Sequence, residues 1–275
     1  MATQVALVTG VSSGIGNATA KKLIEHGYRV FGTARSESSP MPPKVERVLL
    51  DVRDSASIDK GVREVLAKAG RIDLLVNNAG GGLVAAVEET SVDQAQELFD
   101  VNFFGAVRVT QAVLPAMRAQ RSGRIVFISS IVGFLPAPYM GFYAASKHAL
   151  EGLAESLDHE TRAFGIRATL VEPGWMRTNI SEHRIPPANP FDDYAFARAK
   201  AVENVGAKIS GGEDPSIVAE AVLAAATTAR PRLRYPVGKG VSLISRLRRY
   251  LPESMFDGAF RKQFGLDRGG RAPVA

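Results

Sequence analysis

Short apolar runs alternate along the chain with stretches that carry helix signals. Most of these runs are rich in Val, Ile and Leu, and they are Val5–Val8, Arg29–Ala34, Val45–Leu50, Ile72–Val76, Ile125–Ile128, Arg167–Val171 and Arg234–Val237. Near-continuous apolar runs of this kind are typical of parallel strands that are buried on both faces. The pattern therefore predicts a largely parallel sheet.

The stretches between these runs carry the start and stop signals of helices. Gly27 and Gly70 each follow such a stretch, and glycine commonly ends a helix. Ser91 is placed to cap a long helix through Met117, although Pro115 is expected to end or bend its last turn. The alternation predicts an α/β protein with a single Rossmann-type, doubly wound parallel sheet of about seven strands and helices on both faces.

The alternation breaks late in the chain. Residues 180–213 hold a proline-rich stretch followed by an Ala/Lys-rich helix near Asp192–Val205. Long irregular insertions in compact domains are usually functional, so we expect a substrate flap here, within a cofactor-binding domain of residues 1–240. Residues 241–265 predict an amphipathic helical extension, and residues 266–275 a disordered tail.

Composition and charge exclude several kinds of site. The chain has 275 residues and no cysteine, which excludes disulfides and thiolate metal ligands, and its four histidines are too scattered to predict a metal site. The net charge is +6. Residues 230–275 carry 11 basic and 3 acidic side chains, so the basicity is a C-terminal feature and predicts no nucleic-acid partner. With no signal-peptide pattern and no apolar run of membrane-spanning length, we expect a cytoplasmic protein.

A glycine-rich loop follows the first predicted strand and opens the first helix. In the sequence Thr9–Gly16, Gly10 permits a sharp turn, Gly14 lets the backbone approach a pyrophosphate, and Gly16 allows close packing of helix on strand. The helix N-terminus offers unpaired N–H groups to phosphates. An ordinary glycine-rich turn is the alternative, but the position between strand and helix favours a dinucleotide site.

The end of the second predicted strand favours NADP(H) over NAD(H). A carboxylate there would bind the ribose hydroxyl of NAD, but the chain has Arg35 instead. A guanidinium is suited to the 2′-phosphate of NADP, and Ser12 and Ser13 add hydroxyl donors. The alternative is that Arg35 is an exposed loop residue.

Tyr143 and Lys147 form the candidate proton-transfer pair. Their spacing of four places both on one face of a predicted helix, where we expect the ammonium to lower the pKa of the phenol. The Tyr-x-x-x-Lys pattern is common by chance. Ser130, however, lies 13 residues before Tyr143 at the end of a strand, where a hydroxyl is able to donate to a substrate carbonyl oxygen.

The combined motifs resemble those of the short-chain dehydrogenase/reductase family. Besides the residues above, the chain has Asp51-Val52, Asn77-Asn78-Ala79-Gly80, Asn102 and Pro173-Gly174 in the family's order and spacing, over about residues 4–180. Taken singly, Asn102 could merely bend its helix and Asn77-Asn78 could be turn chemistry. The chain is most similar to the 17β-hydroxysteroid and retinol dehydrogenase branch, through Thr9–Gly16, Leu50–Asp54 and Arg35.

The resemblance implies a catalytic tetrad and a set of cofactor contacts. In the tetrad the tyrosine exchanges a proton with the substrate oxygen, the serine orients the carbonyl, the lysine holds the nicotinamide ribose, and the asparagine supports a water in the relay; these residues are Tyr143, Ser130, Lys147 and Asn102. The expected cofactor contacts are Gly10, Ser12, Ser13, Gly14, Ile15, Gly16, Arg35, Asp51, Val52, Asn78, Ala79, Gly80, Tyr143, Lys147, Pro173, Gly174 and Thr178.

Bulky apolar residues near the reacting centre predict a lipophilic substrate. The expected substrate contacts are Ser130, Phe134, Tyr139, Phe142, Trp175 and Met176. The predicted activity is NADP(H)-dependent interconversion of a ketone or aldehyde and an alcohol, and the alternative is a non-enzymatic NADP(H)-binding sensor. We expect a homodimer or homotetramer. Peripheral membrane contact through the basic C-terminus is a less favoured expectation.

Overall fold

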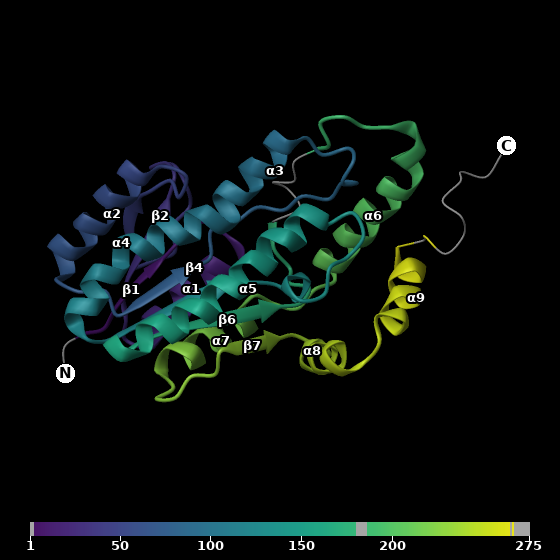
Figure 1. Ribbon diagram of the computed structural model, residues 1–275. Coiled ribbons are helices and arrows are strands. Elements are labelled where there is room, and N and C mark those ends of the chain that lie inside the picture. The colour runs from purple at the N-terminus through teal and green to yellow at the C-terminus, as the bar shows by residue number, and fades with distance from the viewer. Residues whose placement is uncertain (1–2, 180–185, 265, 267–275) are drawn as a thin grey trace.

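The chain folds around one seven-stranded sheet in which all neighbouring strands are parallel (Figure 1). The computed structural model describes residues 3–179, 186–264 and 266. The strands lie in the order β3-β2-β1-β4-β5-β6-β7, and their bounds are β1 Val5–Val8, β2 Arg29–Ala34, β3 Glu46–Leu49, β4 Leu74–Asn77, β5 Gly123–Ile128, β6 Ile166–Pro173 and β7 Arg234–Val237. The predicted doubly wound sheet of about seven strands is therefore confirmed.

Two hydrophobic cores, one on each face of the sheet, hold the helices in place. One core joins the sheet to helices α2, α4 and α5, and the other joins it to α1 and α7. The bounds of the α-helices are α1 Gly14–Glu25, α2 Ser55–Ala69, α3 Val92–Phe99, α4 Gly105–Gln120, α5 Gly141–Thr161, α6 Asp192–Ser210, α7 Ser216–Thr227, α8 Val241–Tyr250 and α9 Glu253–Gln263. Because both faces are covered, the strands need apolar residues at successive positions.

Helix ends follow local capping signals. The Asp54 side chain accepts a hydrogen bond from the backbone N–H of Ala56 at the start of α2, and Gly70 ends this helix with φ +73°. Ser91 and Gln94 form a reciprocal capping box at the start of α3. These caps set where each helix leaves the sheet.

The long helix expected from Ser91 to Met117 is interrupted, and not where the prediction placed the break. A π-helical segment, Asp100–Phe104, separates α3 from α4, whereas α4 continues through Pro115 to Gln120. Of the two outcomes expected at Pro115, an end or a bend of the last turn, the end is therefore wrong. The buried residues Val113 and Met117 on either side of Pro115 hold the last turns against the sheet, which offsets the missing N–H.

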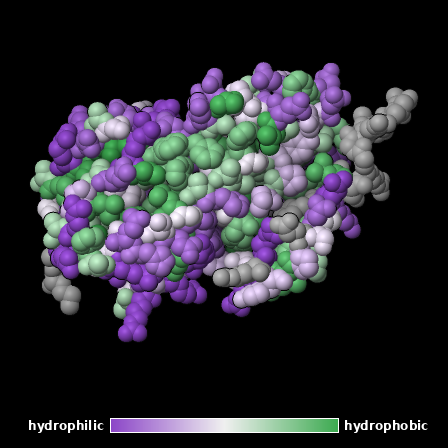
Figure 2. Space-filling view, viewed as in Figure 1, coloured by the Kyte–Doolittle hydropathy of each residue, from purple (hydrophilic) through white to green (hydrophobic). Residues whose placement is uncertain are grey.

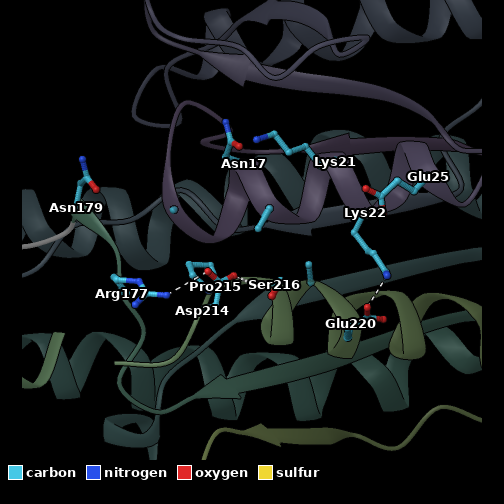
Figure 3. A pocket seen from close by; sticks show the side chains of 13 residues that line it. Asn17, Lys21, Lys22, Glu25, Arg177, Asn179, Asp214, Pro215, Ser216 and Glu220 are labelled. Carbon is cyan, nitrogen blue, oxygen red and sulfur yellow. Dashed lines mark hydrogen bonds and ion pairs between the residues drawn. The ribbon is translucent and has the colours of Figure 1, made fainter. Parts of the chain in front are cut away.

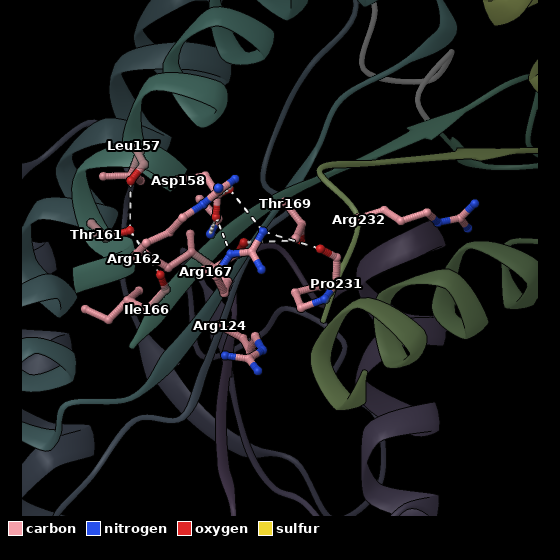
Figure 4. Close-up of polar contacts among 12 residues, drawn as sticks. Arg124, Leu157, Asp158, Thr161, Arg162, Ile166, Arg167, Thr169, Pro231 and Arg232 are labelled. Carbon is pink, nitrogen blue, oxygen red and sulfur yellow. Dashed lines mark hydrogen bonds and ion pairs between the residues drawn. The ribbon is translucent and has the colours of Figure 1, made fainter. Parts of the chain in front are cut away.

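A buried carboxylate joins the end of α5 to the start of β6 (Figure 4). The carboxylate of Asp158 accepts hydrogen bonds from Arg162 Nε at 3.0 Å, Arg167 Nε at 2.7 Å and the backbone N–H of Ala168 at 3.1 Å. Paired and hydrogen-bonded in this way, the buried charge is satisfied. The network fixes α5, which carries the candidate catalytic pair, to the central sheet.

Helices α6, α8 and α9 lie beyond one end of the sheet (Figure 1). Helix α6 is longer than the expected Asp192–Val205, because it runs to Ser210. Residues 180–185 of the expected flap and 267–275 of the expected tail lie outside the described residues. No helix in the described part of the chain is long and apolar enough to cross a membrane.

Candidate active site

A cavity of about 490 Å³ opens at the carboxyl ends of the central strands. Val8 at the end of β1 lies beside Gly32 of β2 and Val76 of β4, so the loops that follow these strands leave the sheet at the same level. Ligands of open α/β sheets bind at this edge. We call this cavity the catalytic cleft.

One part of the cleft, the glycine end, is walled by residues of the glycine loop and of the loop after β4, namely Gly10, Ser12, Ser13, Gly14, Ile15, Asn78, Ala79 and Gly80, whereas the predicted cofactor contact Gly16 lies behind this wall. Gly10 has φ +71° and Gly14 φ +55°, a conformation that glycine adopts without strain. A Cβ on Gly16 would lie 2.2 Å from the carbonyl oxygen of Gly10, so no side chain fits there. The wall is thus shaped for a group that approaches the backbone closely.

The loops after β1 and β4 are tied together at the glycine end. Thr9 Oγ1 accepts hydrogen bonds from the backbone N–H groups of Asn78 and Ala79, each at 2.9 Å. In return, the Asn78 amide donates to the carbonyl oxygens of Thr9 at 2.8 Å and Gly10 at 3.0 Å. Asn78 therefore holds the glycine loop in shape.

Arginines and one carboxylate line the cleft beyond the glycine loop. Arg35 lines the cleft, is exposed, and makes no hydrogen bond to any described residue. Asp51 also lines it, but its carboxylate is held by Arg53, with Nη2 at 2.7 Å from Oδ2. The hydrogen bond from Arg53 lowers the pKa of Asp51 below its usual value. Of the two lining guanidiniums, only that of Arg35 makes no hydrogen bond within the described residues.

The loops after β5 and β6 bring Ser130, Pro173, Gly174 and Thr178 to the same cleft. Ser130 caps a single 3-10 turn, Ile131–Gly133, because its Oγ accepts from the N–H of Val132 at 3.3 Å. Thr178 faces the glycine loop: a Cβ on Gly14 would lie 3.2 Å from Thr178 Cγ2. The predicted cofactor contacts Ser12, Ser13, Ile15, Val52 and Gly80 line the cleft as well.

Tyr143 and Lys147 lie one turn apart near the start of α5, and both line the cleft. Lys147 Nζ donates to the carbonyl oxygen of Ile128 at 2.9 Å and lies 5.8 Å from the centre of the Tyr143 ring. Burial lowers the pKa of Lys147 to about 8, against a smaller raising effect of Glu151. The ammonium is still the main form at pH 7.

The electrostatics of Tyr143 differ from the sequence-based expectation. Burial raises the pKa of the phenol, and a hydrogen bond with Ser130 lowers it by less. The expected lowering of this pKa by Lys147 is not found, and the ammonium instead donates to the carbonyl oxygen of Ile128. The phenol is therefore held in its protonated form, which suits it to donate a proton.

Asn102 lies in the π-helical segment and is almost fully buried. Its side chain accepts from the N–H of Gly81 at 2.8 Å and donates to the carbonyl oxygen of Gly81 and to Ser146 Oγ, both at 3.1 Å. It is not among the described residues that line the cleft. In this arrangement Asn102 positions the loop after β4, and a π-bulge at such a place commonly accompanies a functional site.

Two buried glutamates lie behind the candidate lysine. Glu151 is one turn after Lys147 on α5, and Glu172 lies on β6 immediately before Pro173. Arg234 Nε of β7 lies 2.9 Å from Glu151 Oε2 and 3.5 Å from Glu172 Oε1. Burial, followed by the negative charge of Glu151, raises the pKa of Glu172 to about 8. At neutral pH, Glu172 of this pair therefore carries a proton.

The other part of the cleft, the apolar end, is walled by side chains from distant segments. Its lining residues are Leu83, Val84, Ile131, Val132, Met140, Trp175, Met176, Val205 and Ile209. Of the six expected substrate contacts, the structure brings Ser130, Trp175 and Met176 into the wall. The apolar end offers a hydrophobic surface beside the Tyr143 hydroxyl.

Phe134, Tyr139 and Phe142 do not line the cleft, which corrects their assignment as substrate contacts. Phe142 packs against a separate small cluster of Leu83, Ala85 and Leu98. Tyr139 has φ +61° and packs in the cluster behind the wall, and Phe134 follows the 3-10 turn. Nearness in sequence to Tyr143 did not place these rings in the cleft, because the turn before α5 directs them to other packing sites.

Sequence reasoning missed several residues of the apolar end. Val205 and Ile209 come from α6, and Leu83 and Val84 from the loop after β4. Within α6, Ala201, Val205 and Ile209 recur at intervals of four and are all buried, which is the pattern of a packed helix face. That stripe was the available signal, but its partner in the fold is not visible in the sequence.

A second, open cavity of about 430 Å³ lies between α1 and α7 (Figure 3). Four of its charged side chains form two ion pairs, Lys22 with Glu220, and Arg177 Nη2 with Asp214 Oδ2 at 3.4 Å. None of the predicted catalytic residues lines it. Among the described residues there is also no group of His, Asp or Glu that could hold a metal ion. The catalytic cleft is thus the candidate active site.

Comparison with known proteins agrees with this geometry. A family model described as short chain dehydrogenase matches residues 4–188. The chain belongs to the short-chain dehydrogenase family. A 3-ketodihydrosphingosine reductase of Bacteroides thetaiotaomicron is 36% identical over 95% of this chain and 98% of that protein. An NADPH-dependent 3-dehydrocapnine reductase of Ornithobacterium rhinotracheale is 30% identical over 94% of this chain and 96% of that protein.

Solved structures share the fold. A short-chain dehydrogenase from Streptomyces avermitilis is 36% identical, with a TM-score of 0.76 over 94% of this chain and 98% of that chain. A Burkholderia phymatum member in complex with NAD is 25% identical, with a TM-score of 0.80 over 100% of this chain and 98% of that chain. A serine dehydrogenase in complex with NADP+ is 26% identical, with a TM-score of 0.74 over 85% and 94%. The chain is therefore an oxidoreductase of a family that binds NAD or NADP.

Proposed function

We propose that this protein is an NADP(H)-dependent oxidoreductase that interconverts a lipophilic ketone or aldehyde and the corresponding alcohol. The observation that carries the proposal is the position of Tyr143. Its half-buried phenol lines the cleft with Ser130, which lowers the pKa of the phenol, where the glycine end meets the apolar end. A proton donor between a nucleotide cradle and a hydrophobic wall suits carbonyl reduction.

The residues present fit a nicotinamide dinucleotide, which when bound supplies the hydride that reaches the carbonyl carbon. Gly10 and Gly14 line the cleft without a side chain, which leaves the backbone there open to the pyrophosphate. Ser130 orients the carbonyl oxygen, and Tyr143 Oη gives it a proton. Lys147, one turn away on α5 and charged at pH 7, would hold the ribose of the nicotinamide. In the oxidative direction the same atoms take the proton back.

Arg35 supports the preference for NADP(H). Its donors are free of described partners and face the cleft, where a 2′-phosphate would give a charge-assisted contact. The Ornithobacterium relative is named as NADPH-dependent. Both observations favour NADP(H) over NAD(H) for this chain.

The apolar end supports a lipophilic substrate. Its wall consists of aliphatic, methionine and tryptophan side chains, and such pockets gain affinity in proportion to the apolar area they bury. The two curated relatives are named for reduction of 3-ketodihydrosphingosine and of 3-dehydrocapnine. Ketones with a long apolar substituent are therefore the first class to test.

The deciding experiment follows NADPH and NADH oxidation against a panel of ketones and aldehydes of graded hydrophobicity. Tyr143→Phe is the matched blank, since it removes one oxygen atom and leaves the ring. Loss of general acid catalysis lowers turnover at least ~100-fold, while NADPH affinity measured by fluorescence stays within about twofold. Turnover by Tyr143→Phe at the wild-type rate would refute the mechanism. NADPH binding with no turnover on any carbonyl would favour the sensor.

We also propose that the protein forms a homo-oligomer. Figure 2 shows a band of hydrophobic residues over α3, α4 and α5, and Phe104 and Val92 are 48% and 70% exposed. Exposed apolar patches of this kind commonly mark protein interfaces. Light scattering should give a multiple of the 29.4 kDa chain mass, and a monomer at micromolar concentration would contradict the proposal.

A further inference from the structure

Helix α9 is an exposed helix with one buried anchor directly after it. Its described side chains are exposed except Phe256, which is half-buried, and Met255 is 60% exposed. In contrast, Phe264 is only 1% exposed. Leu266 N donates to the carbonyl oxygen of Arg261 at 2.7 Å, and Arg261 Nη2 donates to the Leu266 carbonyl at 3.0 Å, so the turn that presents Phe264 is closed by two hydrogen bonds.

The phenyl ring of Phe264 is buried against the catalytic cleft and not in the core of the sheet. Its cluster contains Val84, Val132, Met140, Val205 and Ile209, together with Ala144 and Ala201. The first five of these residues also line the cleft. Phe264 itself is absent from the lining, so its ring lies directly behind the apolar wall. Figure 1 agrees, since α9 lies beside α6, apart from the sheet.

The wall of the apolar end therefore depends for its packing on one side chain, Phe264, which belongs to a segment that is otherwise largely exposed. Removal of a buried ring leaves a void where its neighbours relax only partly. Here the void would adjoin an existing cleft, so it would extend that cleft by space that an apolar ligand is able to occupy. Val84, Met140 and Ile209 belong both to the cluster that contains Phe264 and to the lining of the cleft.

We propose that Phe264 closes the apolar end of the catalytic cleft and is the specificity-determining residue that limits the length of the substrate's apolar chain. The proposal rests on the lipophilic substrate class given above. A chain that fits within the wall gains about fourfold in affinity for each methylene buried. A longer chain must displace Phe264 from its cluster or leave its end in water, so the gain stops at a set length.

Binding of a homologous series tests the proposal without requiring turnover. Methyl ketones of increasing chain length are titrated in the presence of NADP+, which cannot reduce them. Trp175 reports binding, because it is the one tryptophan of the chain and lines the cleft. For the wild type, affinity should rise with length and then level off. In Phe264→Ala the plateau should move to longer chains, with at least ~10-fold tighter binding of the longest ketone.

Two further variants serve as controls. Met255→Ala changes an exposed apolar residue of the same helix, and its plateau should match the wild type. Phe264→Leu retains an apolar anchor if the alanine variant does not fold, and should move the plateau by a smaller step in the same direction. Superimposable plateaus for the wild type and a folded Phe264 variant would overturn the proposal, as would wild-type affinity that rises without a plateau.

The two proposals fail in different ways. If the proposed function is wrong, NADPH oxidation is absent for every carbonyl while the plateau still shifts. If only the role of Phe264 is wrong, ketones are reduced and their length profile is unchanged in Phe264→Ala. No binding of any ketone by the wild type would count against both.

Discussion

At the glycine end of the cleft the wall is backbone, whereas at the apolar end it consists of side chains. The glycine end is held by hydrogen bonds between adjacent strand ends, such as those that join Thr9 and Asn78 at 2.8–2.9 Å. The apolar end is assembled from the loop after β4, the start of α5, α6 and the segment after α9, and the side chains of its wall meet by hydrophobic packing. A hydrogen-bonded backbone fits one ligand shape. Packed apolar side chains, in contrast, can be substituted by others of similar volume at a modest cost in stability.

The two ends of the cleft therefore suit different ligands. A dinucleotide is the same molecule for every member of such a family, and a rigid backbone cradle suits it. Substrates vary, and a wall of Val84, Met140, Ile209 and Phe264 changes with single substitutions. Tyr143 and Lys147 lie between the two ends on α5, which Asp158 fixes to the sheet. We therefore expect substitutions at the glycine end to have large effects on cofactor binding and stability, and substitutions at the apolar end to be tolerated.

The same substitution at two glycines should give the largest contrast. Gly16→Ala would place a Cβ 2.2 Å from Gly10 O and 2.5 Å from Asn78 Nδ2, so the glycine loop must move. We expect NADPH affinity to fall at least ~10-fold and the free energy of unfolding to drop by roughly 1–3 kcal/mol, as for other overpacked sites. Isothermal titration and urea unfolding measure these two quantities.

Gly206→Ala is the matched control at the apolar end. Gly206 lines the cleft from α6, and a Cβ there meets nothing within 4 Å. Alanine in a helix interior is favoured over glycine by about 0.5–1 kcal/mol, so stability should rise slightly and NADPH affinity should not change. Equal losses in both variants would mean that the two ends do not differ in rigidity.

The second prediction concerns the charge at the rim of the glycine end. Arg35→Asp removes the donors for a 2′-phosphate and offers a carboxylate to a ribose hydroxyl instead. We expect the ratio of NADPH to NADH in kcat/KM to fall by about 10- to 100-fold, equivalent to ~1.4–2.8 kcal/mol. Arg35→Lys, which keeps the charge, should retain the preference for NADPH. An unchanged ratio in Arg35→Asp would remove the basis for NADP(H).

The two ends also differ in how far the sequence predicts them. The loop Thr9–Gly16 and the pair Tyr143 and Lys147 are local patterns, so their geometry follows from a turn or one helix turn. The wall at the apolar end depends on contacts between residues as far apart as Val84 and Phe264. No local pattern encodes such contacts, and the rings chosen by nearness to Tyr143 pack elsewhere.

The pKa values of the groups where the two ends of the cleft meet could not be predicted from local sequence either, because they too depend on the whole fold. The spacing of Tyr143 and Lys147 predicts that the ammonium lowers the pKa of the phenol, but burial has the larger effect and raises it. Similarly, Glu151 and Glu172 are 21 positions apart and on different elements, yet they lie together behind Lys147. Burial is a property of the whole fold, and it decided the outcome in both places.

The third prediction concerns the glutamate pair, which lies where the two ends meet. The pKa of Glu172 is raised to about 8, so between about pH 5 and pH 8 the folded protein binds a proton that the unfolded chain has released. Stability must therefore fall as pH rises through this range. Glu172→Gln cannot release this proton and keeps a similar shape, so its stability should lack this decline.

Urea unfolding of both proteins at pH 5 to pH 9 measures the effect, which is the smallest of the three. We expect the difference in unfolding free energy, variant minus wild type, to grow by at least ~1 kcal/mol between pH 5 and pH 8.5. Glu155→Gln is the control, because Glu155 also binds Arg234 but its side chain is 49% exposed. A pH-independent difference for Glu172→Gln would mean that both glutamates are ionised. The buried charges would then have to be balanced by Arg234 and Lys147, the two cations nearest to the pair.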